Sequence, residues 1–240
     1  MSFPYISIII PVLNDASSLG QLLAQLQSYR QDGHEVVVVD GGSRDGSMTV
    51  ARKLSDRVLI SGTGRSRQMN LGADNASHDI LLFLHADAIL PPEGLHRIPQ
   101  LLADPKHAWG RFDVYLDQPG LIYGLIAWMM NRRSRLTGVA TGDQGIFVHR
   151  DLFHRIGGYR DISLMEDVAI SKDLLNFSRP LCLQEKLGVS ARRWHKHGVL
   201  KTIAFMWYLR LGYFLGRSPE KLAKLYYPAA SDESGSSDNV

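Results

Sequence analysis

The chain has 240 residues, of which 45% are hydrophobic and 21% charged, proportions that are ordinary for a soluble globular protein with a real core. A single cysteine, Cys182, excludes an internal disulfide framework and fits a reducing compartment. The formal net charge of +3 gives no reason to expect a nucleic-acid partner, although basic clusters at 65–67, 132–135 and 192–196 favour a phosphate-bearing one.

The first half of the chain alternates strands and helices. Its first residues, MSFPYISIII, lack the basic start and the long apolar run of a signal peptide, so we expect a cytoplasmic protein. Apolar and β-branched runs predict buried strands over 6–10, 36–40, 58–61 and 79–87. Helices are predicted between them, after Asn14, up to about Lys53, and over 66–76. This order predicts an α/β fold, a Rossmann-like, doubly wound and mostly parallel sheet.

Polar residues follow three of these strands. Ligands of a doubly wound sheet bind outside the carboxyl ends of its strands. The residues that fall there are Pro11 and Asn14 after the first strand, Asp40 and Asp45 after the second, and His85 and Asp87 after the fourth. Three such clusters at one edge predict that this edge is the active site.

The second half continues the same sheet, without a repeat or a linker. WGRFDVYL (109–116) alternates like an amphipathic strand, and a helix is predicted over 121–133. A short strand at GIFVHR, a helix, the turn GGY and a helix that begins near Glu166 follow.

The segment VLKTIAFMWYLRLGYFLG (199–216) is apolar enough to suggest a membrane. Lys201 and Arg210 within it, and its marginal length, argue against a membrane-spanning helix. Its apolar residues exceed what one core-facing stripe needs, and basic residues from Arg192 to Arg210 surround them. This pattern predicts a helix that lies in the interface of an anionic membrane. Burial against the rest of the domain is the alternative.

Several motifs together resemble the family 2 glycosyltransferases of the GT-A fold. They occur in the family's order and are IIIPVLN, VVVVDGGSRDGS, GRSRQMNLGA, FLHAD, GDQGIFVHR, GGY and LMEDVAIS. The resemblance covers residues 6 to about 195. The later SARRWHKHGVLKT and SPEKLAKLYY resemble a bacterial subgroup associated with arsenosugar biosynthesis and extend the match to about residue 227.

The resemblance implies one GT-A domain over residues 1–228. Residues up to about 105 would bind the nucleotide sugar, about 106–198 the acceptor, and 199–228 would add C-terminal helices. The tail, 229–240, is small and polar and is expected to be disordered.

The resemblance also implies a divalent cation, Mn²⁺ or Mg²⁺, that bridges the donor diphosphate. Such hard cations prefer oxygen ligands, and Asp87 corresponds to the last aspartate of the family's Asp-X-Asp signature. Capping of a helix is the alternative for Asp87. The first position of that signature is His85 here, which would shift metal preference towards manganese, bind the ribose, or act as a buried structural histidine.

The nucleoside is expected at Asp40 and Asp45, whose carboxylates can accept hydrogen bonds from ribose or base. Many family members have a second aspartate at position 41, which reads the nucleobase. This chain has glycine there, so the resemblance does not identify the nucleobase of the donor. Asp45 has helix capping as its alternative. The family reading assigns the donor phosphates to Arg65 and Arg67. GTGRSR (62–67) also resembles a dinucleotide fingerprint, but Arg67 replaces its third glycine, which disfavours an NAD-linked oxidoreductase.

The family's Glu-Asp motif implies that Asp167 is the general base and that Glu166 orients its neighbours or the acceptor. Complementing the helix dipole is the alternative for this pair. Asp143 and Gln144 are expected in the acceptor or sugar pocket, with a tight turn as the alternative. Arg193 or Arg192 is expected at the leaving diphosphate, and His195 or His197 as a further metal ligand, with ordinary surface charge as the alternative.

We therefore predict a metal-dependent, inverting glycosyltransferase. Its partners would be a nucleotide-diphosphate sugar and a small-molecule or lipid-linked acceptor, in the cytoplasm or at the inner face of the membrane. The alternative from another class is a GT-A-like protein that binds a nucleotide sugar without turnover.

Overall fold

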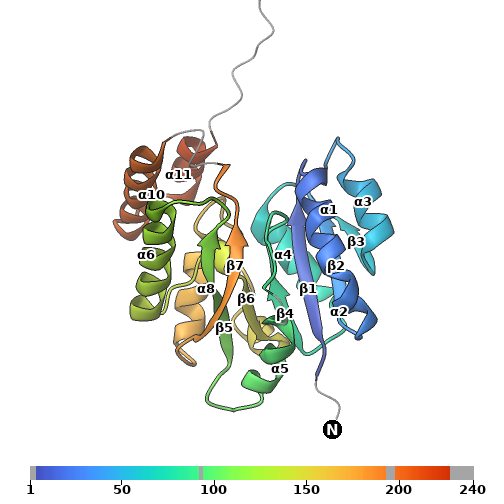
Figure 1. Ribbon diagram of the computed structural model, residues 1–240. Helices are drawn as coiled ribbons and strands as arrows, with labels where there is room; N and C mark the ends of the chain where they lie inside the picture. Colours follow the sequence, from blue (N-terminus) through green and yellow to red (C-terminus); the bar gives the residue numbers. More distant parts are fainter. Residues whose placement is uncertain (1–3, 92–93, 193–197, 228–240) are drawn as a thin grey trace, which may run out of the picture.

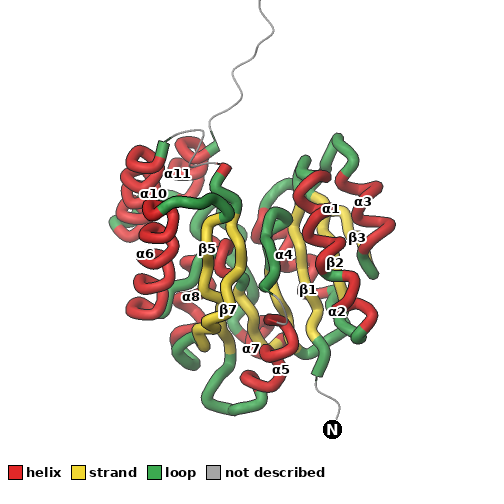
Figure 2. Tube along the Cα trace, viewed as in Figure 1, coloured by secondary structure: helices red, strands yellow, loops and turns green. Residues whose placement is uncertain are grey.

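The computed structural model describes residues 4–91, 94–192 and 198–227, and in this part of the chain seven strands form one sheet (Figures 1 and 2). The strands lie in the order β3-β2-β1-β4-β6-β5-β7. Their bounds are β1 (Ile6–Val12), β2 (Glu35–Asp40), β3 (Arg57–Ile60), β4 (Ile80–Phe83), β5 (Trp109–Leu116), β6 (Ile146–His149) and β7 (Leu181–Val189). Only β6 runs antiparallel to its neighbours, β4 and β5. The predicted α/β fold with a mostly parallel sheet is confirmed.

Helices cover both faces of the sheet. Those of the first half are α1 (Ala16–Gln25), α2 (Gln27–Gln31), α3 (Ser47–Leu54), α4 (Arg65–Asp74) and α5 (Arg97–Leu102). Those of the second half are α6 (Leu121–Thr137), α7 (Arg150–Arg155), α8 (Glu166–Leu175), α10 (Val199–Phe214) and α11 (Pro219–Tyr226). Two 3₁₀ turns are η1 (Gly94–His96) and η2 (Gly142–Gln144). Buried apolar side chains of α1, α3 and α5 pack on one face of the sheet, and those of α4, α7 and α8 pack on the other, as in a doubly wound sheet.

The central strands form because both of their faces are apolar. Val36 to Val39 are fully buried, alternate members facing the two opposite cores. Asp15 ends the loop after β1 and caps α1 by accepting a hydrogen bond from the Ser18 backbone N–H. Such a cap satisfies one of the free donors at a helix start. The first βα unit was therefore predictable from local sequence.

Strand β4 is shorter than the predicted 79–87. Its antiparallel partner β6 pairs with it only as far as Phe83, opposite Ile146. Beyond that point the Leu84 backbone N–H still donates to Ile9 O, but no strand among the described residues pairs on the other side. His85, Ala86 and Asp87 consequently leave the sheet as a loop at its edge.

Strand β5 is not the amphipathic strand that its alternation predicted. It lies between β6 and β7, and seven of its eight residues are buried. Arg111 is fully buried because its guanidinium pairs with Asp113 and donates to Phe112 O. The sequence pattern did not predict β7, which continues the sheet from the second half.

A buried glutamate links the amino ends of three central strands. The Glu35 carboxylate accepts hydrogen bonds from Ser7 Oγ (2.6 Å) and from the Ser77 backbone N–H (2.8 Å) and hydroxyl (2.9 Å). Burial alone would raise the pKa of Glu35, but these bonds and the charge of Arg57 outweigh it and lower the pKa below the ordinary value. The charged form therefore stabilises the fold.

Replacing Glu35 by glutamine is expected to lower the free energy of unfolding at pH 7 by about 1–3 kcal/mol, because hydrogen bonds to a charged acceptor are lost. A lowered pKa means that this stabilisation is present above the unfolded-state pKa and disappears as pH falls through the folded-state pKa. Urea unfolding of both proteins at pH 7 and in acid measures the difference, which should shrink in acid. The control is Asp79→Asn, whose carboxylate is 81% exposed. An equal effect of both substitutions at pH 7 would contradict this role.

Candidate active site

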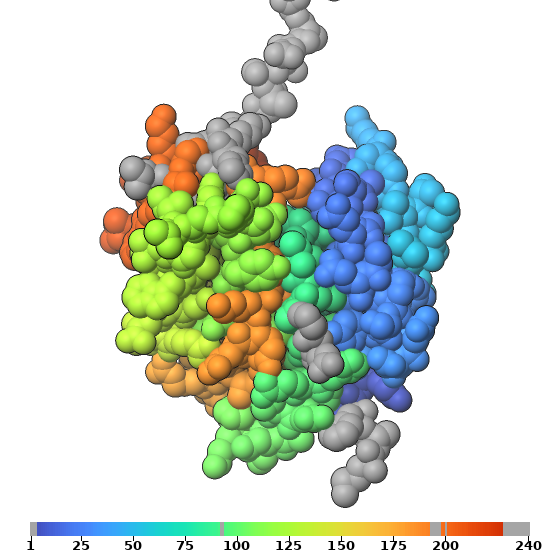
Figure 3. Space-filling view, in the orientation of Figure 1, coloured from blue at the N-terminus to red at the C-terminus, as the bar shows by residue number. Residues whose placement is uncertain are grey.

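A cavity of about 680 Å³ lies at the carboxyl ends of β1 and β4, where the sequence predicted the site. Its walls come from segments far apart in the chain, at positions 11–13, 15, 63–68, 85–87, 161–163, 166, 223 and 227. In the space-filling view the blue and cyan first half and the yellow-green and orange second half lie on opposite sides of the molecule (Figure 3). The cavity therefore combines residues from both halves.

Six of the predicted site residues line this large cavity, namely Pro11, Arg65, Arg67, His85, Asp87 and Glu166. Arg65 and Arg67 belong to the first turn of α4, whose N-terminus favours anions. The Arg67 Nε lies 2.9 Å from the carboxylate of Asp161, so the cavity wall is fixed across the two halves. Cations, carboxylates and a helix start together suit a phosphate–metal pair.

A second, smaller cavity of about 70 Å³ adjoins the first. Arg65, His85 and Glu166 line both cavities, so these residues form the partition between them. The small cavity adds Asp143, Asp167 and Arg210 from the second half of the chain. The site thus has a large compartment beside the strand ends and a small one beside the Glu-Asp pair.

The Glu-Asp pair is presented by the first turn of α8. The Asp167 carboxylate accepts hydrogen bonds from the Gly142 backbone N–H (2.9 Å) and the Val168 backbone N–H (2.7 Å). The preceding Met165 has φ +69°, in the left-handed region that a methionine rarely adopts. Such local strain is found where surrounding structure dictates the backbone, often at functional sites.

Glu166 is almost fully buried, with 8% of its surface exposed. Burial raises the pKa of its carboxyl, and the neighbouring charge of Asp167 raises it further. Arg65 acts in the opposite direction but does not reverse the shift. The two adjacent carboxyls therefore differ in environment, which is the usual means of separating acid–base roles.

His85 is held in one place by two neighbours. Its Nδ1 lies 3.1 Å from Asp143 Oδ1, and its Nε2 lies so close to Gly142 that a Cβ there would come within 2.4 Å. Burial would raise the pKa of Asp143, but the hydrogen bond with His85 and its charge outweigh burial and lower the pKa. Asp143 and His85 act as one polar unit between the two cavities.

Asp40 ends β2 and is 1% exposed. Its Oδ2 accepts hydrogen bonds from the backbone N–H groups of Gly42 (3.0 Å) and Ser43 (2.9 Å). Its Oδ1 is buried and has no hydrogen-bond partner among the described residues. Asp40 does not line the large cavity. Through Oδ2 it holds the loop that follows β2, and its Oδ1 stays unsatisfied by the described residues.

Three predicted site residues hydrogen-bond to other parts of the protein, and their contact with a ligand stays a prediction. Asn14 Oδ1 accepts from the Arg44 backbone N–H (2.7 Å), and Asp45 accepts from Ala16 (3.0 Å) and Ser47 (2.9 Å), so both connect two loops. Gln144 is fully buried, and its Nε2 donates to Ser134 Oγ (3.0 Å). None of the three lines either cavity.

The metal ligands were predicted at Asp87 and His195. His195 and Arg193 lie outside the described residues. Within the described part, no group of three or more His, Cys, Asp or Glu side chains could hold a metal ion. Asp87 Oδ2 faces Arg192, whose Nη2 is 3.7 Å away. Asp87 is thus one of four carboxylates at the wall of the large cavity, and among the described residues it forms no metal-binding cluster with the others.

Sequence reasoning gave no site role to two residues that line the cavities. Arg210 was expected to meet lipid, but it lines the small cavity beside Asp167. Tyr227, the last residue of the motif SPEKLAKLYY, lines the large cavity. Both placements depend on how the last helices pack. Arg192, the alternative to Arg193 at the leaving diphosphate, contacts Asp15 at 3.3 Å.

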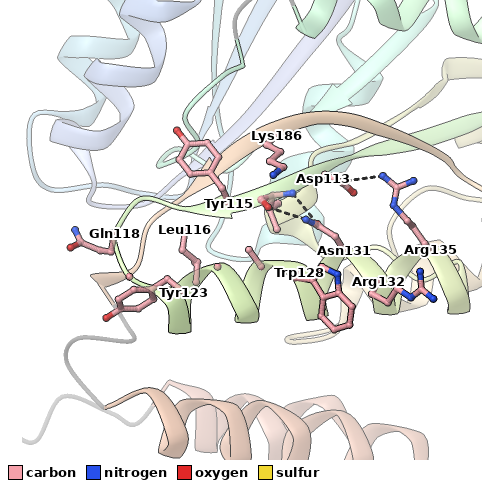
Figure 4. A pocket seen from close by; sticks show the side chains of 14 residues that line it. Asp113, Tyr115, Leu116, Gln118, Tyr123, Trp128, Asn131, Arg132, Arg135 and Lys186 are labelled. Carbon is pink, nitrogen blue, oxygen red and sulfur yellow. Dashed lines mark hydrogen bonds and ion pairs between the residues drawn. The ribbon is translucent and has the colours of Figure 1, made fainter.

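A third cavity, of about 430 Å³, lies between α6 and the strands β5 and β7 (Figure 4). The Asn131 amide accepts from the Val114 N–H and donates to Val114 O, and Arg135 pairs with Asp113 at 2.7 Å. These polar groups already have partners within the chain. None of the predicted site residues lines this cavity, so the first two cavities form the candidate site.

The chain is similar to known glycosyltransferases. The Glycosyl transferase family 2 model matches residues 7–159. A PGL/p-HBAD biosynthesis glycosyltransferase of Mycobacterium bovis is 30% identical over 177 residues, covering 66% of this chain and 64% of that protein. An undecaprenyl-phosphate 4-deoxy-4-formamido-L-arabinose transferase of Pseudomonas syringae is 32% identical over 108 residues, covering 40% of this chain and 32% of that protein. The chain spans less than two thirds of the length of these relatives.

Solved structures share the fold. The mannosyltransferase PcManGT from Pyrobaculum calidifontis, in complex with GDP-Man and Mn²⁺, has a TM-score of 0.64 at 20% identity, covering 88% of this chain and 62% of that chain. Glucosyl-3-phosphoglycerate synthase from Mycobacterium tuberculosis, in complex with Mn²⁺, UDP and glucosyl-3-phosphoglycerate, has a TM-score of 0.61 at 18% identity, covering 90% and 80% of the two chains. These likenesses confirm the predicted GT-A fold.

Proposed function

The chain belongs to glycosyl transferase family 2, and from this membership we propose that it transfers a sugar from a nucleoside-diphosphate sugar to an acceptor hydroxyl. One observation carries the proposal. A cavity large enough for a nucleotide sugar, lined by Arg65, Arg67 and Asp87, adjoins a small cavity that holds Asp167. Donor phosphates and an acceptor hydroxyl can therefore be placed side by side.

In this proposal Arg65 and Arg67 neutralise the donor diphosphate at the start of α4. Asp87 suits a divalent cation, because Mg²⁺-like ions are bound by one or two carboxylates together with substrate phosphates. When bound, such an ion would stabilise the departing diphosphate as a Lewis acid. Mn²⁺ in the complexes of PcManGT and glucosyl-3-phosphoglycerate synthase supports a divalent ion.

Asp167 takes the proton of the acceptor hydroxyl, and Glu166 orients the acceptor from the partition between the cavities. The two backbone N–H groups that bind Asp167 hold its carboxylate in place. One positioned base and direct displacement make the reaction inverting. His85 and Asp143, paired at the same partition, orient the sugar or ribose. Arg193 is proposed to cover the leaving diphosphate.

The proposal extends to the rest of the chain. We propose that residues 1–228 act as a single domain, because one sheet contains strands from both halves. A place in the subgroup of arsenosugar biosynthesis rests on the terminal motifs, whereas the relatives named above act in other pathways by their names. The predicted disordered tail, 229–240, lies outside the described residues.

Thermal-shift screening with UDP-, GDP- and TDP-sugars and Mn²⁺ tests donor binding, because a bound ligand raises the apparent stability. The nucleotide sugar with the correct nucleobase should raise the melting temperature, and it should do so only when the metal is present. Release of the nucleotide then distinguishes the enzyme from a protein that binds without turnover. Absence of any shift with all three donors would count against the proposal.

We also propose peripheral contact with a membrane through α10, extended by α6. Within the described residues, no helix is both long and apolar enough to cross a bilayer. One face of α10 nevertheless exposes Trp207, Leu211, Phe214 and Leu215. On α6, the exposed large apolar residues are Leu121, Ile122, Leu125, Trp128, Met129 and Leu136. Neither helix contains an acidic residue, and both carry basic ones, which suits an anionic lipid surface.

Flotation with phosphatidylglycerol vesicles is expected to recover the protein, and neutral vesicles should recover much less. The double substitution Trp207→Ser and Leu211→Ser should weaken the partition at least about tenfold, because each side chain loses its apolar transfer energy. The control is Ile60→Ser, which removes an equally exposed apolar residue from β3. A wild-type protein that stays in the soluble fraction with anionic vesicles would refute the contact.

A further inference from the structure

Gln68 bridges the carboxyl ends of the first two strands. It belongs to α4, which packs against β1 and β2 (Figure 1). Its Nε2 donates hydrogen bonds to Val12 O (2.9 Å) and to Val39 O (2.7 Å). Carbonyl oxygens can only accept hydrogen bonds, so the amide must turn its nitrogen towards them. The orientation of the amide is therefore fixed, with both N–H groups used and Oε1 left over.

The Oε1 atom of Gln68 is a hydrogen-bond acceptor at the wall of the large cavity, which Gln68 lines. None of the described residues donates a hydrogen bond to this atom, and it is not one of their unsatisfied atoms that are closed to solvent. Asp15, at the same wall, already has partners, because its Oδ1 accepts from the Ser18 backbone N–H and its Oδ2 lies 3.3 Å from Arg192. A ligand in the cavity therefore meets one neutral acceptor that is free to bind it.

Gly41 leaves the room that this amide occupies. A Cβ at position 41 would lie 3.1 Å from Cδ, Nε2 and Oε1 of Gln68, so it would press on the face of the amide. The backbone of Gly41 is held by Thr63, whose Oγ1 donates to Gly41 O at 3.0 Å. A side chain at position 41 would therefore displace the amide, and glycine allows the amide to reach the two strand ends.

The two sides of the large cavity suit different parts of a nucleotide. Arg65 and Glu166 line the partition to the small cavity, so the proposed diphosphate site lies on that side. Gln68 lies about one helical turn further along α4 and bonds to strands of the first half. Pro11 and Leu13 line the cavity with it and offer apolar surface to a flat ring. The crevice beside β1, where the strand order reverses, is also where doubly wound sheets bind nucleotides.

We propose that Gln68 Oε1 accepts a hydrogen bond from the nucleobase of the donor and selects uracil or thymine. The pairing edge of these two bases presents one N–H group, at N3, which matches one free acceptor. Adenine and cytosine have a ring nitrogen there that is itself an acceptor and would repel Oε1. Guanine presents two adjacent N–H donors, of which one would stay unmatched. This inference rests on the proposed glycosyl transfer and specifies its donor as a sugar linked to a uracil or thymine nucleotide.

The first test varies the nucleotide and needs no variant of the protein. Isothermal calorimetry with Mn²⁺ compares UDP, 5-methyl-UDP, GDP, ADP and CDP, so that the ribose stays the same and thymine is represented by 5-methyluracil. UDP and 5-methyl-UDP are expected to bind at least about tenfold more tightly than the other three, because a site built for an N–H group rejects bases that lack it. A methyl group at N3 removes the donor, so 3-methyl-UDP should bind about 10- to 100-fold more weakly than UDP. Tightest binding of GDP, ADP or CDP would overturn the inference.

The second test assigns this preference to Gln68. Gln68→Met nearly keeps the volume of the side chain but removes the acceptor, so UDP should lose its advantage over 3-methyl-UDP. A merely structural bridge between β1 and β2 predicts that both nucleotides lose affinity equally and that their ratio stays unchanged. Gly41→Ala presses on the amide without removing it and should lower the same ratio in part.

Thr63→Val is the matched control, because it removes a hydrogen bond from the same cavity wall without removing an acceptor from Gln68. It should keep the ratio of the wild type. Melting temperatures without nucleotide show whether each variant folds, and Gly41→Ala decides if Gln68→Met does not. An unchanged ratio in the folded variant, or an equal loss in Thr63→Val, would overturn the inference. If the wild type binds none of the nucleotides with Mn²⁺, the proposed function fails instead, so the two failures are distinguishable.

Discussion

Replacing Asp167 by asparagine is expected to lower the rate of sugar transfer by about two to four orders of magnitude, the usual contribution of a positioned base. Asparagine nearly keeps the shape of the side chain but cannot accept the proton. Donor and metal binding should survive, because Arg65, Arg67 and Asp87 line the other cavity. Hydrolysis of the donor by water should fall in parallel, since water would use the same base.

The alternative role for Asp167 is structural. Its two carboxylate oxygens accept from different backbone N–H groups, Oδ2 from Gly142 and Oδ1 from Val168, and asparagine can keep only one of these bonds. A structural role therefore predicts that Asp167→Asn lowers the melting temperature and donor binding together with transfer, whereas loss of the base alone lowers transfer and leaves both unchanged. Turnover and donor-binding titrations of both proteins, measured side by side, separate the two roles.

Glu166→Gln is the matched comparison for Asp167→Asn. Glu166 is the more buried carboxyl, its pKa is raised, and it lies at the partition between the cavities. An orienting role predicts a smaller loss of transfer than in Asp167→Asn. A reversed order, with Glu166→Gln the more damaging, would make Glu166 the base and remove Asp167 from the mechanism.

Asp87→Ala is expected to abolish the metal dependence of nucleoside-diphosphate binding. Asp87 is the acidic residue of the loop after β4 and lines the large cavity, with 37% of its side chain exposed. Its loss should leave the fold intact, because the side chain fills no core. Binding with and without Mn²⁺ is measured by thermal shift, in which a bound ligand raises the apparent stability.

Asp161→Ala is the control for Asp87→Ala. Asp161 lines the same cavity, but its carboxylate pairs with Arg67 at 2.9 Å. This variant should keep its response to Mn²⁺ even if its affinity changes. The same metal response in Asp87→Ala as in the wild type would exclude Asp87 as the metal ligand.

Local sequence predicted the first half of the fold because its strands are apolar on both faces. Val36 to Val39 are four consecutive β-branched residues, a pattern typical of a strand buried on both faces, and all four are fully buried. The second half was harder, because its strands contain polar residues that pair with one another inside the protein. Arg111 and Asp113 gave β5 the alternation of an exposed strand, yet their ion pair allows burial. In β7 the cause is different, because Gln184 and Lys186 are exposed and Glu185 pairs with Arg97, so a run of three polar residues interrupts the strand pattern.

The site was predictable in position more than in detail. Motifs located the residues along the chain, and six of them line the large cavity. A motif does not say which way a side chain points, and Gln144 turns into the core to reach Ser134. Arg210 could not be assigned, because only the packing of α10 on the domain shows which of its faces is inward.

The place of β4 in the sheet has a consequence for how the protein is made. Its four apolar residues pair on one side with β1 and on the other with β6, which is formed by residues 146–149. While the chain emerges from the ribosome, β4 therefore has one open edge until some sixty further residues have been synthesised. An unpaired apolar edge invites pairing with other chains. The first half of the chain therefore completes its sheet only when β6 has been made, and we expect residues 1–105 alone to aggregate more readily than the whole chain.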